Sequence, residues 1–187
     1  MTFIETKLPG MFVIESDVHS DERGSFEAAW HREELAQQSL DAEVAQVSIA
    51  SNRRRGTIRG LHFQAPPFQE AKIVRVIRGL AWDVAVDLRP DSPTYRQWCG
   101  LELSAETRRM VYIPRGFLHG FQALTDVADT CYRIDAAHDP TEDVSVAFAD
   151  PDLGIPWPLP PTLVSDRDRA APSWRDLCAR LAPSAAT

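Results

Sequence analysis

Several signatures of common functional classes are missing from this sequence. The five histidines form neither an HxH nor an HExxH pattern, so no short segment carries a metal site of either kind. The three cysteines, Cys99, Cys131 and Cys178, are scattered and have no CxxC spacing. This usage is typical of free thiols in a reducing compartment, and we therefore expect a cytoplasmic location.

Long apolar runs and an excess of positive charge are missing as well. No run approaches the roughly 20 apolar residues that a membrane span requires, and residues 1–5 lack the basic-then-apolar order of a signal peptide. The formal net charge of −7 argues against a general nucleic-acid binder. We therefore expect neither a membrane nor a nucleic acid as partner, whereas local arginines could still bind an anionic small ligand.

The composition that is present is that of an ordinary soluble globular protein. Apolar residues make up 44% and charged residues 25% of the 187 positions, enough for one domain with a sizeable core. Short candidate strands recur at spacings of about 8–12 residues between glycines and prolines, which predicts an all-β sandwich or barrel. The expected strands span residues 44–51, 57–64, 72–77, 80–88, 95–103, 110–113, 117–124 and 130–134.

A few short peripheral helices and one irregular segment complete the predicted single domain over residues 1–187. Residues 31–39 are expected to form a short polar helix. The segment 151–172 is rich in proline, and we expect it to wrap irregularly around the strands. The sequence SWRD at 173–176 resembles a capping box, which predicts a last short helix over about residues 173–182.

The stretch RGLHFQ at residues 59–64 carries the densest set of chemically active side chains. In an extended strand, His62 shares a face with Gly60 and Gln64. A glycine inside a strand indicates a bulge or a close backbone approach, and we expect Gly60 to leave space beside the imidazole for a ligand. The alternative is a core histidine bonded to the backbone. Arg59 and Lys72 lie in or beside apolar strands, where a charge needs a partner.

Proton transfer is one chemistry that these residue types support. His62 could act as a base if a carboxylate held its other ring nitrogen. Tyr132 could act as an acid, and its alternative is an ordinary strand aromatic. His62 and His119 could contribute to a metal site assembled from distant strands, but no third ligand is evident. We therefore expect no metal site.

Six ordered motifs resemble those of the dTDP-4-dehydrorhamnose 3,5-epimerase family, over about residues 3 to 175. They are DERG at 21–24, RGLHFQ at 59–64, KIVRV at 72–76, DVAVDLR at 83–89, IPRGFLHGF at 113–121 and SDRD at 165–168. The resemblance implies a cupin-type jelly roll that pairs as a homodimer, with an N-terminal strand exchanged or packed across the interface. The second cupin signature, PxGxxH, is present at 114–119, whereas RGLHFQ replaces the metal-binding HxH. The resemblance therefore implies metal-free chemistry.

The resemblance also implies roles for particular residues. His62 matches the general base, Asp168 its orienting carboxylate with Asp166 as the alternative, Lys72 the enolate-stabilising cation, and Tyr132 the proton donor. The residues implied to contact the ligand are Arg23, Phe26, Gln46, Arg59, His119 and His138. The chain departs from many members at position 138, where a histidine replaces a second tyrosine, and at position 28, where an alanine replaces a carboxylate.

The implied activity is epimerisation of a nucleotide-diphospho-4-keto-6-deoxysugar at C3, C5 or both. The protons on these carbons are weakly acidic because both carbons adjoin the carbonyl group. The carbonyl is itself the electron sink, so we expect no cofactor, and the expected partner is a nucleotide-diphosphate sugar. The alternatives are a C3-only epimerase, a keto-isomerase, a non-catalytic sugar-nucleotide-binding cupin and, more distantly, a metal-dependent cupin oxygenase. Rhamnose for a surface polysaccharide and a modified deoxysugar are both compatible pathway products.

Overall fold

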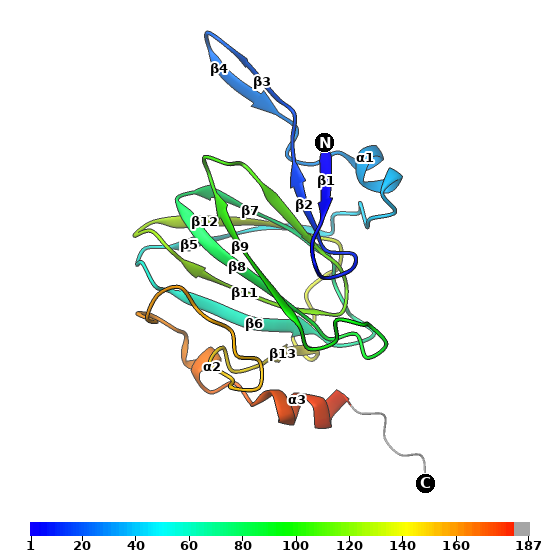
Figure 1. The fold of residues 1–187 in the computed structure, drawn as a ribbon, viewed down its shortest axis with the longest axis vertical. Helices are drawn as coiled ribbons and strands as arrows, with labels where there is room; N and C mark the ends of the chain where they lie inside the picture. Colours follow the sequence, from blue (N-terminus) through cyan, green and yellow to red (C-terminus); the bar gives the residue numbers. More distant parts are fainter. Residues whose placement is uncertain (182–187) are drawn as a thin grey trace.

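Two antiparallel sheets face each other in the computed structural model, which describes residues 1–181 (Figure 1). In sheet order, the six-stranded sheet contains β1 (Thr2–Glu5), β2 (Phe12–Glu15), β10 (Met110–Ile113), β7 (Lys72–Arg78), β12 (Ala128–Ile134) and β5 (Gln46–Asn52). The five-stranded sheet contains β13 (Asp143–Ser145), β6 (Ile58–Gln64), β11 (Phe117–Ala123), β8 (Leu80–Asp87) and β9 (Trp98–Ser104). The all-β class predicted from the strand spacing is confirmed.

Strand β8 illustrates how the sequence builds the two layers. Successive side chains of a strand point to opposite faces of the sheet, so alternate residues of β8 share a face. Ala81 and Ala85 pack between the two sheets, with Phe121 of β11 and Val74 of β7. Val84 and Val86 lie on the opposite face. Both faces of this strand are therefore buried, although by different parts of the chain.

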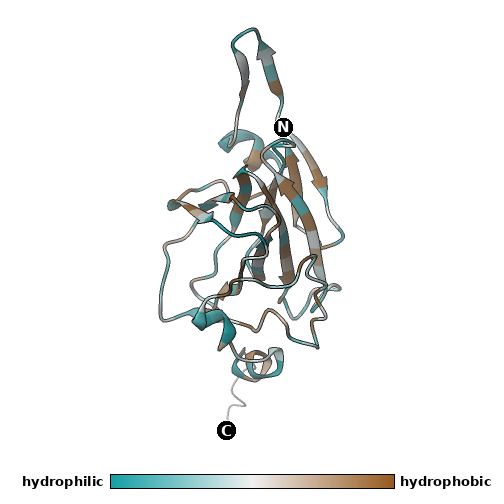
Figure 2. Ribbon diagram, turned by 90° about the vertical axis from the view of Figure 1, so that its left-hand side faces the viewer, coloured by the Kyte–Doolittle hydropathy of each residue, from teal (hydrophilic) through white to brown (hydrophobic). Residues whose placement is uncertain are grey.

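The outer face of the five-stranded sheet is covered by the end of the chain. Helix α3 (Trp174–Leu181) places Trp174 and Leu177 in one apolar cluster with Val84, Val86 and Leu118 of the sheet. Hydrophobic residues accordingly concentrate on the strands, whereas the short α2 (Asp166–Arg169) is hydrophilic (Figure 2). Helix α3 begins within the range predicted for the last helix, and residue 182 of that prediction lies outside the described residues.

Helix α1 (Arg32–Gln37) covers part of the outer face of the six-stranded sheet. Its Leu35 is buried with Ile14 of β2, Ile73 of β7 and Met110 of β10. The helix predicted over 31–39 is thus confirmed, one residue shorter at its start and two at its end. One apolar side chain fixes the whole helix, because the remaining positions are exposed or only partly buried.

Four short elements were missed by the sequence reasoning. They are β3 (Val18–Asp21), β4 (Gly24–Glu27), β13 and α2. The DERG motif at 21–24 spans the turn that joins β3 and β4 into a hairpin, which projects away from the two sheets (Figure 1). The strand predicted from residue 95 begins only at Trp98, because residues 92–97 form turns in which Arg96 has a φ of +68°.

Two further sequence expectations concern the chain as a whole. No helix among the described residues is long and apolar enough to cross a membrane. Cys99, Cys131 and Cys178 are free thiols. The cytoplasmic location and the single-domain organisation over 1–187 stay predictions.

Candidate active site

A pocket opens between the two sheets where β6 and β11 pair. His62 of β6 and His119 of β11 are direct cross-strand partners, and residues directly opposite each other project to the same face. The facing sheet contributes side chains from β5, β7 and β12. Seven of the ten predicted site residues line this pocket, namely Gln46, Arg59, His62, Lys72, His119, Tyr132 and His138.

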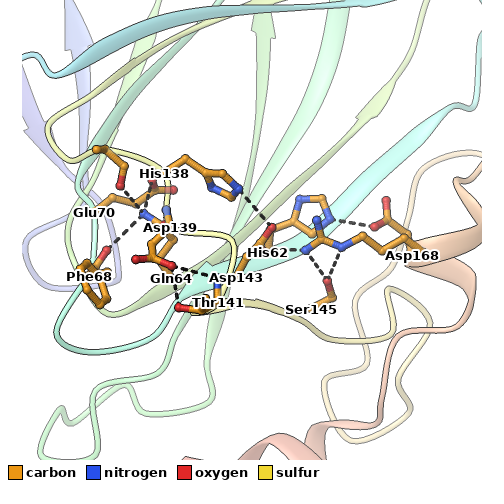
Figure 3. Close-up of polar contacts among 12 residues, drawn as sticks. His62, Gln64, Phe68, Glu70, His138, Asp139, Thr141, Asp143, Ser145 and Asp168 are labelled. Atoms are coloured by element: carbon orange, nitrogen blue, oxygen red, sulfur yellow. Dashed lines mark hydrogen bonds and ion pairs between the residues drawn. The ribbon is translucent and has the colours of Figure 1, made fainter.

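His62 is held from outside the pocket by Asp168 (Figure 3). The distance from His62 Nε2 to Asp168 Oδ1 is 2.8 Å, and the backbone N–H of Gly60 donates to Asp168 Oδ2 at 3.3 Å. Burial acts to raise the pKa of Asp168, but the hydrogen bonds and charge of His62 hold it below its usual value. The adjacent Asp166 side chain is fully exposed, so the structure favours Asp168 over Asp166 as the partner of His62.

Helix α2 places Asp168 for this contact. Ser165 caps the helix, because its hydroxyl accepts a hydrogen bond from the Asp168 N–H at 3.0 Å. An ionised carboxylate accepts hydrogen bonds only, so the Nε2 of His62 must carry the hydrogen. In a neutral imidazole this leaves the free lone pair on Nδ1. Nδ1 is therefore the nitrogen of His62 that can take up a proton.

Gly60 does not leave the open space that was expected beside the imidazole. A Cβ at this position would lie 2.6 Å from the Cα of Gly120 and 3.0 Å from the carbonyl oxygen of His119. The backbone of β11 therefore occupies the space, and the φ of Gly60 is +125°. The strand register also shifts between His119 and Phe121. The close backbone approach predicted at this glycine is therefore confirmed, whereas the prediction of space for a ligand beside the imidazole is wrong.

The two charges embedded in apolar strands both have partners, as predicted. Lys72 is buried at the start of β7, and its ammonium group pairs with the carboxylate of Glu70. Arg59 donates from Nε to Asn52 Oδ1 at 2.9 Å. Both cations also line the pocket. They consequently bring fixed positive charge to a space that is shared with His62.

Tyr132 lies across the pocket from β6, on strand β12. Burial, followed by the negative charge of Asp83, raises the pKa of its phenol. The ring of His119 meets the ring of Tyr132 edge-on, with centroids 6.0 Å apart and planes at 74°. Tyr132 is thus held as a neutral phenol, which has a proton to donate.

His138 stands at the side of the pocket next to Asp143. Its Nε2 is 3.8 Å from Asp143 Oδ2, and the other carboxylate oxygen of Asp143 is 2.7 Å from Arg167. Figure 3 shows Asp143 between His138 and the His62–Asp168 pair. The position at which the family resemblance implied a second tyrosine therefore carries an imidazole close to a carboxylate.

Arg23 and Phe26 are the two predicted ligand residues that the structure does not bring to this pocket. Both lie on the β3–β4 hairpin and line a separate hollow on it. Arg23 pairs with Asp21, and Phe26 is 75% exposed. Within one chain, therefore, neither side chain lies in the lining of the His62 pocket.

The comparisons with known proteins agree with the geometry. The family model described as dTDP-4-dehydrorhamnose 3,5-epimerase matches residues 5–176. The chain belongs to this family. A curated dTDP-4-dehydrorhamnose 3,5-epimerase of Methanothermobacter thermautotrophicus is 42% identical over 178 residues, covering 94% of each chain. The family membership predicted from the six motifs is confirmed.

Solved structures include relatives with different names. A dTDP-6-deoxy-D-glucose-3,5-epimerase of Legionella pneumophila, in complex with dTDP-4-keto-L-rhamnose, is 34% identical, with a TM-score of 0.91, covering 100% of this chain and 99% of its own. A 3′-monoepimerase of Streptomyces bikiniensis, in complex with dTDP-quinovose, is 37% identical, with a TM-score of 0.85, covering 94% and 89%. The cupin-type jelly roll expected for the family is confirmed.

Several functional neighbours were not singled out from the sequence. Glu70 pairs with Lys72, Asp83 with His119, and Asp143 with both His138 and Arg167. One of them had a visible signal, since Asp83 lies between apolar residues in the middle of its strand. Within residues 1–181, no group of three or more histidine, cysteine, aspartate and glutamate side chains is arranged to hold a metal ion.

Proposed function

We propose that this protein epimerises a nucleotide-diphospho-4-keto-6-deoxysugar at C3, C5 or both. The observation that carries the proposal is the His62–Asp168 pair, 2.8 Å apart, in a pocket shared with Lys72 and Tyr132. A base, a cation and a proton donor are the three groups that inversion next to a carbonyl requires. The family membership supports the same reaction.

The chemistry assigns one task to each side chain. Nδ1 of His62 removes the proton from a carbon next to the carbonyl, while Asp168 stabilises the imidazolium that forms. The electron pair of the broken C–H bond moves into the carbonyl, and the Lys72 ammonium stabilises the resulting enolate oxygen. Such stabilisation is worth about 3–4 kcal/mol per oxyanion donor in other enzymes. Tyr132 then donates a proton to the opposite face of the carbon, which inverts its configuration.

The test is proton exchange with solvent. The protein is incubated in deuterated water with dTDP-4-keto-6-deoxyglucose, and with the CDP and GDP analogues in parallel. NMR then reports deuterium at C3 and C5 and the stereochemistry of the product. We expect deuterium to enter together with inversion for at least one nucleotide. Binding without exchange would support a non-catalytic cupin instead, and migration of the keto group would support an isomerase.

Inversion of C3 alone is the second candidate. His138 favours it, because an imidazole next to Asp143 replaces the tyrosine of many relatives in the pocket wall. The chain is also about as similar to the Streptomyces bikiniensis 3′-monoepimerase as to the Legionella pneumophila 3,5-epimerase. Deuterium at C3 without deuterium at C5 would distinguish this activity from double inversion.

We also propose that the active form is a homodimer in which the β3–β4 hairpin completes the partner's site. Arg23 and Phe26 resemble ligand residues of the family, but they sit on a hairpin that projects from the molecule (Figure 1). Phe26 is 75% exposed, and Val47 and Ile49, on the outer face of edge strand β5, are 59% and 62% exposed. A second copy of the chain would bury such surfaces.

Complementation tests the dimer. Arg23→Ala and His62→Ala are each expected to lower activity strongly as pure proteins. After subunit exchange between the two variants, a mixed dimer would contain one site with wild-type His62 and a wild-type hairpin from its neighbour. We therefore expect activity to reappear on mixing. Sedimentation as a monomer at assay concentration, or no recovery after proven subunit exchange, would contradict the proposal.

A further inference from the structure

A second histidine–carboxylate pair lies beside the first, with His119 in the lining of the pocket and Asp83 behind it. His119 Nε2 is 2.8 Å from Asp83 Oδ2. His119 faces His62 directly across β11 and β6, while Asp83 reaches it from β8, where it pairs with Phe121 of β11. Asp83 is only 1% exposed. A charged group is thus enclosed in the apolar layer between the two sheets.

Stability alone does not account for Asp83. Its second carboxylate oxygen, Oδ1, is buried and has no hydrogen-bond partner among the described residues. An unpaired buried polar atom costs free energy, and in a native protein it calls for an explanation. Asp87 offers the contrast, because it lies on the same strand and face and accepts hydrogen bonds at both oxygens from Arg89, Ser92 and Thr94.

Asp83 has a physical connection to Tyr132. Through Nε2 it fixes His119, and the ring of His119 lies edge-on to the ring of Tyr132 at 6.0 Å between centroids. The charge of Asp83 also raises the pKa of the Tyr132 phenol, second only to burial. Asp83 is therefore coupled to Tyr132 in two ways, through the packing of the His119 ring and through its charge.

We propose that Asp83 is a positioning residue that acts through His119 to hold Tyr132 as the proton donor of the inverting step. The inference rests on the proposed epimerase function. In that step the Tyr132 O–H bond breaks, the enolate electron pair forms the new C–H bond, and the carbonyl is restored. Water then returns a proton to the phenolate and removes one from His62, so protons balance over the cycle.

The structure predicts a particular failure when Asp83 is changed. His62 and Asp168 lie across the pocket from Tyr132 and still remove the proton. Without a correctly placed Tyr132, the enolate regains a proton from the same face, from His62 or from water. The sugar then exchanges its hydrogen for deuterium without changing configuration. A loss of fold, in contrast, would lower exchange and inversion together.

The experiment measures the ratio of deuterium incorporation to inversion, with the full-length chain and dTDP-4-keto-6-deoxyglucose in deuterated water. For Asp83→Asn we expect the ratio of deuterium incorporation to inversion to rise by at least about tenfold, less than the roughly 10²–10⁴-fold ascribed to a general acid itself, because Asp83 acts only through His119. His119→Gln, which breaks the connection from the pocket side, should raise the ratio as well. It serves as the second variant if Asp83→Asn folds poorly, as judged by thermal unfolding.

Two controls make the test specific. Asp87→Asn removes a buried carboxylate from the same strand, and it should lower the unfolding temperature without changing the ratio. Tyr132→Phe should raise the ratio by itself, and adding Asp83→Asn to it should change the ratio little, because both act on one group. Multiplying effects in the double variant would overturn the proposal.

Failure of the proposed function and failure of the role of Asp83 give different results. A wild-type protein that neither exchanges nor inverts would overturn the proposed function together with the role of Asp83. A wild-type protein that inverts, combined with an unchanged ratio in Asp83→Asn and His119→Gln, would overturn the role of Asp83 alone.

Discussion

The two histidine–carboxylate pairs of the pocket have the same nitrogen–oxygen distance but opposite environments. The His62 side chain is 37% exposed, whereas that of His119 is 6% exposed. His62 can therefore exchange protons with water and meet a substrate, which a base must do. His119 also lines the pocket, but it is almost fully buried and has little access to water. Solvent access, more than the hydrogen bond itself, decides which histidine can be the base.

The two carboxylates also come from different parts of the chain. Asp83 belongs to β8 and is 36 residues from His119, within the packed body of the barrel. Asp168 is 106 residues from His62 and arrives on α2, at the end of the wrapping segment. Trp174 and Leu177 then anchor the following helix to the outer face of the sheet. The partner of the base thus depends on correct docking of the chain's last part.

The largest effect should come from removing the exposed member of the two pairs. His62→Ala deletes the proposed base, and general base catalysis typically contributes about 10²–10⁴-fold. We expect deuterium incorporation and inversion both to fall by at least this factor. His62 is half-exposed, so the unfolding temperature should change little, and its measurement serves as the control. Retained exchange in a folded His62→Ala protein would remove His62 from the reaction.

Asp168→Asn should have the next largest effect. The amide cannot stabilise a positive imidazolium as a carboxylate does. Loss of the orienting partner of a metal-binding histidine commonly costs about 10–100-fold, and we expect an effect of the same scale here. Exchange and inversion should fall in parallel, because the base serves both. A changed ratio between them, as expected for Asp83→Asn, would mean that the two carboxylates do not have separate tasks.

A third prediction separates stability from chemistry on strand β8. Burial acts to raise the pKa of Asp87, but hydrogen bonds from Arg89, Ser92 and Thr94 hold it below the unfolded value. Its contribution to stability is therefore fully present above the unfolded pKa of about 3.9 and is lost as the pH falls through the lower folded pKa. Asp87→Asn should cost about 1–3 kcal/mol of unfolding free energy at pH 7.

Denaturant unfolding at several pH values checks this prediction. The difference between wild type and Asp87→Asn should be constant from pH 7 to about pH 5 and should shrink at lower pH. A matched measurement on Asp168→Asn should show the same direction, since the pKa of Asp168 is also lowered. A difference that grows towards acid would contradict the ionised state assigned to these carboxylates.

Much of the fold could be predicted because the pattern of each strand is local. The alternation in 80–88 places Asp83 and Asp87 on one face and Val84 and Val86 on the other, as the structure has them. The elements that were missed are three or four residues long, too short for a period to show. Whether β3 and β4 lie against the barrel or project from it depends on packing, which no local pattern specifies.

Seven residues that line the pocket could be named from the sequence, but most of the contacts around them could not be predicted. Gly60 illustrates the limit, because its space is taken by Gly120, a residue on another strand whose register the sequence does not reveal. The Asp83–His119 pair also depends on the pairing of β8 with β11. The resemblance implied Asp168 as the partner of His62 with Asp166 as the alternative, and the docked orientation of α2 turns Asp168 towards His62.

The smallest effect should come from Asp166→Asn, which tests that orientation directly. Asp166 occupies the same short helix as Asp168, but its side chain is fully exposed, with only a 3.9 Å contact to the exposed Arg169. Exposed ion pairs of this kind contribute little. We expect exchange, inversion and the unfolding temperature to stay at wild-type values, within about twofold for the rates. If Asp166→Asn instead lowered exchange as far as Asp168→Asn, His62 would take its partner from a different orientation of α2 during the reaction. Asp166 would then replace Asp168 as the carboxylate partner of the exposed His62, in contrast to the enclosed His119–Asp83 pair.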